Sequence, residues 1–235
     1  MHSTIYKADS RGHADHGWLN TYYSFSFADY YNPDRMRFGA LRVLNDDTVQ
    51  GGMGFGMHPH DNMEIITILL KGALEHKDNM GYTEIIQEND VQVMSAGTGI
   101  VHSEQNKNQH QPVSLLQLWI LPNQHNVQPR YGQQTFNPLH RKNRLQQIVG
   151  PYINDNNLWI HQNAWLYLGS LSKDCTIDYA TKRKHNGVYV FVIDGDITIN
   201  NECLHVRDAI GIRDVENISI TANNNAELLL IDIPL

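Results

Sequence analysis

Two short pairs of potential metal ligands stand in the first half of the chain, and the members of each pair are two residues apart. His58 and His60 form the first pair, and His102 and Glu104 form the second. Residues two apart on a β-strand point to the same face, so two such pairs on neighbouring strands would aim three imidazoles and one carboxylate at a single point. That donor set suits a divalent transition metal. The sequence therefore predicts a function that works through a metal rather than through a nucleophilic side chain.

Glycine-rich segments precede both pairs, at residues 52–56 and 97–99. Glycine in a strand marks a bend or a close approach of the backbone to a site. A single pair of ligand-type residues two positions apart is most often a chance surface pattern. Two such pairs, each after a glycine-rich turn, favour one metal site that both pairs share. A second carboxylate, Glu64, follows His60 by four residues and shares its face on a regular strand. The spacing leaves both Glu64 and Glu104 open as the fourth ligand.

Short strands are the elements that must position these residues. Apolar runs rich in β-branched and aromatic residues are bounded by Gly, Asn, Asp or Pro, and no long segment shows sustained helical periodicity. Regular short strands with turn signals indicate a sandwich or a jelly-roll barrel, so the sequence predicts an all-β fold. The runs are 64–70, 114–120, 188–193, 196–199, 218–220 and 227–233.

A weak internal repeat relates the two halves of the chain. In each half an apolar run ends at a glycine, Gly72 or Gly195, and an aspartate, Asp90 or Asp208, opens a later strand. The recurrence of this glycine and this aspartate at corresponding strand ends favours duplication of one barrel unit.

The second half of the chain lacks the pairs of potential metal ligands that the first half has. His185 has no ligand-type residue two positions away, and no His-x-Glu follows in the C-terminal segment. Residues 122–151 are rich in Gln, Asn, Pro and Arg and indicate a connection between the halves. We therefore expect a metal-binding domain at 1–135 and a domain without metal at 136–235.

Composition and charge argue against several function classes. The chain of 235 residues can bury a sizeable core without crosslinks. Its two cysteines, Cys175 and Cys203, lie outside any C-x-x-C pattern, which argues for a reducing compartment. The net charge of −7 argues against direct nucleic-acid binding. There is no signal-peptide pattern and no apolar run of membrane-spanning length, so the sequence predicts a cytoplasmic protein without membrane contact.

The motifs resemble the bacterial pirin family of the cupin superfamily. Gly52-x5-His58-x-His60-x3-Glu64 and Gly97-x-Gly99-x2-His102-x3-Asn106 are similar to the two cupin motifs. The likeness to pirins runs from the N-terminus through residues 117–120 and continues more weakly to 231–235. It is carried by RGHADHGWL (11–19), TYYSFSFA (21–28), HPH (58–60) with Glu64, and MSAGTGIVHSE (94–104).

This resemblance implies a bicupin, with two jelly-roll β-barrels in one chain and the metal in the N-terminal barrel. It implies that Glu104, rather than Glu64, completes the ligand set of His58, His60 and His102. Glu64 is then expected either to orient an imidazole or to pair with a basic side chain. The implied cofactor is one divalent transition metal ion, with Fe(II) favoured over Cu, Ni, Co, Mn or Zn.

The implied activity is that of quercetin 2,3-dioxygenase, which acts on a small aromatic or enediol substrate and O2. Glu104 is then both a ligand and the candidate catalytic base. Apolar residues near the site are candidates for a flat aromatic pocket, although plain core packing is the more common role for any one of them. They are Phe38, Met53, Phe55 and Met57. Two alternatives stay open: a metal-binding regulatory or redox-sensing protein that acts through a protein partner, and a cupin enzyme on another metabolite.

Overall fold

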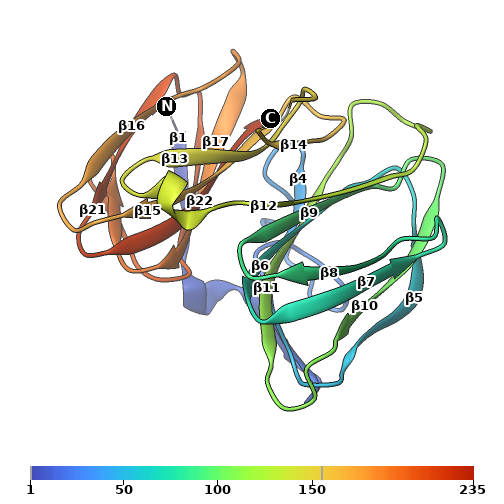
Figure 1. Ribbon diagram of the computed structural model, residues 1–235. Coiled ribbons are helices and arrows are strands. Elements are labelled where there is room, and N and C mark those ends of the chain that lie inside the picture. Colours follow the sequence, from blue (N-terminus) through green and yellow to red (C-terminus); the bar gives the residue numbers. More distant parts are fainter. Residues whose placement is uncertain (1, 155) are drawn as a thin grey trace.

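Four β-sheets make up most of the computed structural model, which spans residues 1–235 and describes residues 2–154 and 156–235. The sheets form two lobes, each with a seven-stranded and a four-stranded sheet (Figure 1). This arrangement confirms the predicted all-β fold with two jelly-roll-like halves. The helices among the described residues are the 3-10 turns η1 (Ala8–Ser10) and η2 (Pro138–Arg141). None of them is long and apolar enough to span a membrane.

In the first lobe the metal-ligand candidates lie on the smaller sheet, which faces the larger one. In spatial order the larger sheet contains β12 (Arg130–Thr135), β9 (Asp90–Ser95), β6 (Glu64–Lys71), β11 (Val113–Ile120), β4 (Leu41–Val49), β3 (Leu19–Tyr23) and β2 (Gly12–Asp15). The smaller sheet contains β5 (Gly54–His60), β10 (Ile100–Asn106), β7 (Ala73–Asp78) and β8 (Thr83–Gln87).

The second lobe repeats this plan. Its larger sheet contains β1 (His2–Tyr6), β20 (Ala209–Arg213), β17 (Asn186–Asp194), β22 (Ala226–Pro234), β15 (Trp165–Leu171), β13 (Leu145–Gly150) and β14 (Leu158–Trp159). Its smaller sheet contains β16 (Thr176–Ala180), β21 (Asn217–Ala222), β18 (Ile197–Ile199) and β19 (Glu202–Leu204).

Backbone conformation supports the repeat that the sequence suggests. Gly72 and Gly195, which end matching strands β6 and β17, have φ of 90° and 75°. Asn89 and Arg207 stand immediately before the matching aspartates and have φ of 71° and 67°. Left-handed conformations are uncommon for residues other than glycine, so their recurrence at matching turns reflects one strand plan used twice.

The larger sheet of the second lobe is completed at one edge by a strand from the other end of the chain. β1, at the N-terminus, pairs with β20, whereas the larger sheet of the first lobe ends at β12, which pairs with β9. In Figure 1 the blue β1 lies among the orange and red strands. The carboxylate of Asp208 secures this strand, because it accepts hydrogen bonds from Lys7 Nζ and the Ala8 amide, both at 2.8 Å.

The larger sheets pack against each other through their apolar outer faces. Ile66, Leu116 and Leu118 of the first lobe share one buried cluster with Tyr189 and Phe191 of the second. Because side chains alternate along a strand, the residues between them point into the first lobe instead. Strands β6 and β11 are buried on both faces, which explains their near-continuous apolar runs.

The interiors of the two lobes differ in polarity. The second lobe is filled by one large apolar cluster drawn from both of its sheets. The first lobe buries many polar side chains, which would be costly without hydrogen bonds or a ligand. They include Thr21, Asn45, Asp47, Thr67, His76, Gln92, His102 and Glu104.

Candidate metal centre

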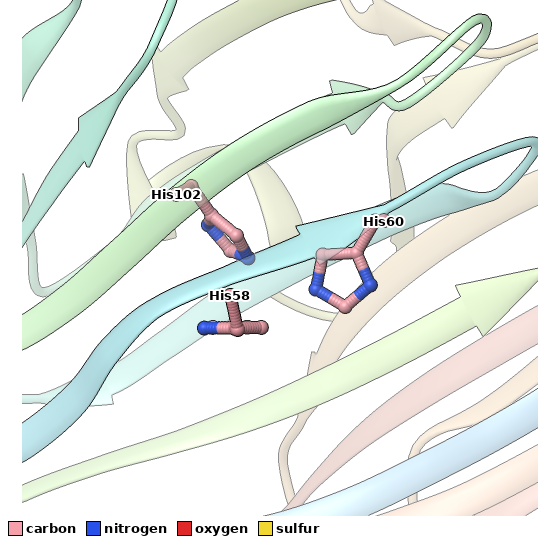
Figure 2. Close-up of side chains that lie close together, drawn as sticks. All are labelled: His58, His60 and His102. Atoms are coloured by element: carbon pink, nitrogen blue, oxygen red, sulfur yellow. The ribbon is translucent and has the colours of Figure 1, made fainter.

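Three imidazoles converge between two neighbouring strands of the smaller sheet. His58 and His60 lie on β5, and His102 lies on β10, where it pairs directly opposite His58. Their ligand nitrogens all lie within 4.8 Å of one another. Figure 2 shows the three rings turned toward a common point from the two strands. The predicted convergence of these histidines is confirmed, whereas their role as ligands stays a prediction.

Hydrogen bonds hold two of these rings so that Nε2 presents a lone pair. His58 Nδ1 lies 2.7 Å from the Gly56 carbonyl oxygen and donates to it, which leaves Nε2 as the acceptor. His102 Nε2 is buried and has no hydrogen-bond partner among the described residues. A buried nitrogen without a partner, beside two more imidazoles, is the arrangement that a metal ion would complete.

A second histidine lies behind His102, and the sequence reasoning missed it. His76 on β7 is fully buried, and its Nδ1 lies 3.4 Å from His102 Nδ1. Its Nε2 donates to Asp78 Oδ2 at 3.0 Å. With its Nε2–H directed at Asp78, His76 can accept through Nδ1 from His102 Nδ1–H, which again leaves His102 Nε2 with a free lone pair. The signal was present in the sequence, because His76 and Asp78 have the same two-residue spacing as the other pairs.

Burial favours the neutral form of two of these imidazoles, His102 and His60. It lowers the pKa of His102 to about 2, helped by the neighbouring His58, His60 and His76. Burial and the proximity of His58 lower the pKa of His60 to about 4. Neutral imidazole is the form that binds a metal, so both rings are ready for a ligand role at neutral pH.

Glu104 is buried in the wall of the same pocket as His58 and His60. A bulge separates it from His102, and Glu104 is not a member of the three-histidine group. Its carboxylate accepts hydrogen bonds from Gln117 Nε2 at 3.0 and 3.3 Å, which connects the two sheets. Burial raises the pKa of Glu104. Its role as fourth ligand and base stays a prediction.

Glu64 lies on the larger sheet and has different partners. Its Oε2 accepts a hydrogen bond from Ser95 Oγ at 2.7 Å. Burial raises the pKa of Glu64 to about 7, while Ser95 and the positive charge of Arg130 oppose that shift. Of the two expectations for Glu64, the structure favours the one in which a basic side chain is its neighbour.

A pocket of about 470 Å³ lies between the two sheets of the first lobe, beside His58 and His60. Its aromatic walls include Trp18, Phe27 and Trp119, and the ring centroids of His60 and Trp119 are 4.9 Å apart. This space suits a flat, largely apolar molecule with one polar edge.

The expected aromatic lining is correct in part. Phe55 and Met57 line the pocket. Phe38 has the alternative role of core packing, because it is buried between the lobes, where its ring centroid lies 5.5 Å from that of Tyr189. Met53 is exposed and lies outside the residues that line this pocket. Both residues lie just outside the strands that border the pocket, since Phe38 precedes β4 and Met53 precedes β5, so strand alternation does not direct their side chains into it.

Two family models match the chain. The one described as Pirin matches residues 5–120, and the one described as quercetinase C-terminal cupin domain matches residues 147–233. Together they support the predicted bicupin organisation.

Similar proteins extend over nearly the whole chain. A quercetin 2,3-dioxygenase from Escherichia coli is 43% identical over 230 residues, which are 97% of either chain. A pirin-like protein from Caulobacter vibrioides is 39% identical and covers 95% of this chain and 96% of its own length. The crystal structure of a bacterial pirin from Escherichia coli in complex with nickel(II) has a TM-score of 0.94, with 41% identity and 99% of both chains covered.

Proposed function

The chain belongs to the pirin family, and from this premise we propose that it is a metal-dependent dioxygenase of the quercetin 2,3-dioxygenase type. The proposed substrate is a flavonol-like aromatic molecule with an enolic hydroxyl, whose central ring is opened by O2 with release of carbon monoxide. One observation carries the proposal: three imidazoles converge at the edge of a pocket with aromatic walls.

His58, His60 and His102 would hold one divalent transition metal ion, with Glu104 as the proposed fourth ligand. Imidazole and carboxylate donors suit Fe(II), which we favour, and also Cu, Ni, Co, Mn and Zn. When bound, an ion of this kind supplies Lewis-acid polarisation of the substrate oxygen and a place to organise dioxygen. The nickel(II) complex of the Escherichia coli pirin supports a single divalent ion at this site.

Glu104 is the proposed base for the enolic proton. Its burial raises its pKa, which makes the carboxylate a stronger proton acceptor than an exposed one. Gln117 donates to both carboxylate oxygens and so fixes the direction in which they point. The carboxylate is therefore held in place before the substrate arrives, which reduces the reorganisation that proton transfer requires.

The aromatic walls would orient the flat substrate and exclude water. Phe27 packs edge-on against Trp119, with centroids 5.1 Å apart, and Trp18 packs edge-on against Phe55 at 5.2 Å. These interlocked rings form rigid surfaces on which a planar molecule can stack. We assign this chemistry to the proposed domain 1–135 and a supporting role to the proposed domain 136–235, whose interior is apolar.

Oxygen uptake tests the proposal directly. Protein loaded with Fe(II) is mixed with a flavonol while dioxygen consumption and flavonol absorbance are followed together. We expect one O2 consumed for each flavonol lost, at a rate above that of the same concentration of free metal. Equal rates for protein and free metal would refute the dioxygenase assignment and leave the chain as a metal-binding protein with another role.

A further inference from the structure

Buried polar groups without partners lie on the sheet that faces the histidines. Asp47 and Asn45 on β4 are each 3% exposed, and both line the pocket. Among the described residues, neither Asp47 Oδ1 nor Asn45 Oδ1 has a hydrogen-bond partner of good geometry. Buried acceptors are almost always hydrogen-bonded in native proteins, so these two oxygens point to a ligand that completes them.

Strand register places Asp47 at the end of the pocket away from the histidines. Trp119, which contacts His60, lies on β11 two residues from Gln117, and Gln117 pairs with Asn45. Asp47 lies a further two residues along β4. Because two residues advance a strand by about 7 Å, Trp119, Asn45 and Asp47 mark three successive levels of the pocket.

The surroundings of Asp47 are partly apolar and, among the described residues, contain no cationic partner. Its neighbour on β11 is Leu115, which belongs to a buried apolar cluster with Leu69. On β3 its partner in register is Thr21, which also lines the pocket. Burial raises the pKa of Asp47 to about 7, and the negative charges of Glu104 and Asp46 add to this shift. The nearby Thr21 hydroxyl lowers that pKa, and none of the ion pairs among the described residues includes Asp47. A carboxyl group in such a place can both accept and, when protonated, donate a hydrogen bond.

The neighbouring carboxylate, Asp46, has a structural role on this strand and can be compared with Asp47. It points to the opposite face of β4, where its Oδ2 lies 3.1 Å from Arg11 Nη1 and 3.4 Å from Arg207 Nε. Asp47 has no such partners, although it is more deeply buried. Its position is therefore better explained by recognition than by stabilisation of the fold.

We propose that Asp47, assisted by Asn45, is the specificity-determining residue of this pocket and binds the phenolic hydroxyls on the outer ring of the substrate farthest from the histidines. The inference rests on the proposed function for the identity of the ring system. It narrows the substrate class to polyhydroxylated flavonols, with one oxygen function at the histidine end and further hydroxyls at the Asp47 end. A site built to bond a hydroxyl discriminates strongly against an analogue that lacks it, because its buried acceptor is then left unpaired.

Binding of two flavonols under anaerobic conditions tests this assignment without turnover. The parent 3-hydroxyflavone has no hydroxyl on its outer rings, whereas quercetin carries hydroxyls on both outer rings. Quenching of tryptophan fluorescence gives the two Kd values for the metal-loaded protein, because Trp18 and Trp119 line the pocket. The variants are Asp47→Leu, Asp47→Asn and, as a matched control, Thr48→Val, which changes the next side chain on the opposite face of β4.

We expect the wild type to bind quercetin about tenfold or more tightly than 3-hydroxyflavone. Asp47→Leu should reduce this preference to about twofold or less, because quercetin loses its hydrogen bond and 3-hydroxyflavone no longer leaves a buried acceptor unpaired, and Asp47→Asn should give an intermediate preference. Thr48→Val should retain the full preference. Because both ligands are measured on the same sample, a fraction of unfolded variant cancels in the ratio.

A wild type without preference, or a preference that survives both Asp47 substitutions, overturns the inference. The two proposals fail in different ways. Oxygen consumption with an unchanged preference would refute the role of Asp47 alone. A preference that depends on Asp47 in a protein that consumes no oxygen would support the binding site and refute the dioxygenase assignment alone.

Discussion

The imidazole of His76 lies behind that of His102, with 3.4 Å between their Nδ1 atoms. The Asp78 carboxylate accepts a hydrogen bond from the far side of His76, and neither His76 nor Asp78 has an exposed side chain. This buried series fixes which nitrogen of His102 carries the proton. It also fixes the plane of the ring, so that Nε2 faces His58 and His60 before any metal arrives.

Removing the imidazole of His102 should abolish metal binding. His102 is the most buried of the three clustered histidines, and no other side chain among the described residues forms a three-member group with His58 and His60. We expect His102→Ala to purify with less than about a tenth of the metal of the wild type, since two imidazoles rarely retain an ion. Elemental analysis of protein grown in the same medium measures this, with His110→Ala as the exposed control. Stoichiometric metal in His102→Ala would rule out the proposed centre.

Replacing His76 should weaken the centre without removing a ligand. His76→Leu leaves His102 Nδ1 without its partner, so the ring loses its fixed tautomer and orientation. Such outer partners typically contribute about 10–100-fold in metal affinity. Competition against a chromophoric chelator measures the affinity, and the melting temperature of the metal-free protein shows whether the fold has suffered. An affinity equal to that of the wild type would show that the contact with His102 is incidental.

A matched pair of substitutions can show whether Glu104 or Glu64 is the fourth ligand, which the spacing alone left open. Glu104→Gln should lower both metal affinity and kcat, the latter by about 10²-fold or more, because it removes the proposed base. Glu64→Gln should leave metal affinity unchanged, because Glu64 bonds to Ser95 on the other sheet. Chelator competition and steady-state oxygen uptake measure the two effects. The reverse result, with Glu64→Gln the damaging change, would restore Glu64 as the ligand.

The features that depend on spacing along one strand could be predicted from the sequence, because alternation places residues two apart on one face. This is why His58 and His60 share a face, whereas their convergence with His102 also required β5 and β10 to be neighbours, which the two similar ligand pairs suggested. His76 was missed because β7 becomes the neighbour of β10 only through the strand order of the sheet. Asp47 was missed for a related reason, since its place opposite the histidines depends on how two sheets face each other.

Some contacts between distant strands could be suspected from polar residues inside apolar runs of the sequence. Thr67 and Gln117 interrupt apolar runs, and they pair in register on the inner face of the first lobe. A polar residue in the middle of a strand buried on both faces has to meet another polar group, which a single sequence cannot identify. The pairing of β1 with β20 left no such trace, because nothing in residues 2–6 specifies a partner so distant in the chain.

The contact between Lys7 and Asp208 predicts a stability that depends on pH. Burial alone would raise the pKa of Asp208, but hydrogen bonds from Lys7 and the Ala8 and His205 amides lower it below the usual value. A carboxyl group with a depressed pKa stabilises the folded protein above its unfolded pKa of about 3.9 and loses that contribution as the pH falls through the folded value. Asp208→Asn should therefore cost about 1–2 kcal/mol at pH 7, and the difference from the wild type should shrink below about pH 4.

Urea unfolding at several pH values measures this difference, and Asp214→Asn is a suitable control. Asp214 lies 4.0 Å from His2 on the same pair of strands, but both side chains are exposed, so its substitution should have little effect. A gap between wild type and Asp208→Asn that persists undiminished at the lowest pH would show that the carboxylate charge is not what secures β1.

Phe38 and Met57 should respond to substitution in opposite ways, because one is in the core and the other lines the pocket. Phe38 is 1% exposed, and its ring occupies space that a Cβ at Gly187 or Gly211 would invade, at 2.8 and 2.7 Å. Phe38→Ala should lower the free energy of unfolding by about 3–5 kcal/mol and leave flavonol binding by the folded protein unchanged. Met57 is 58% exposed, so Met57→Ala should change stability by less than about 0.5 kcal/mol while weakening flavonol binding. Urea titration and fluorescence quenching measure the two quantities, and weaker flavonol binding by folded Phe38→Ala would place Phe38 back in the pocket.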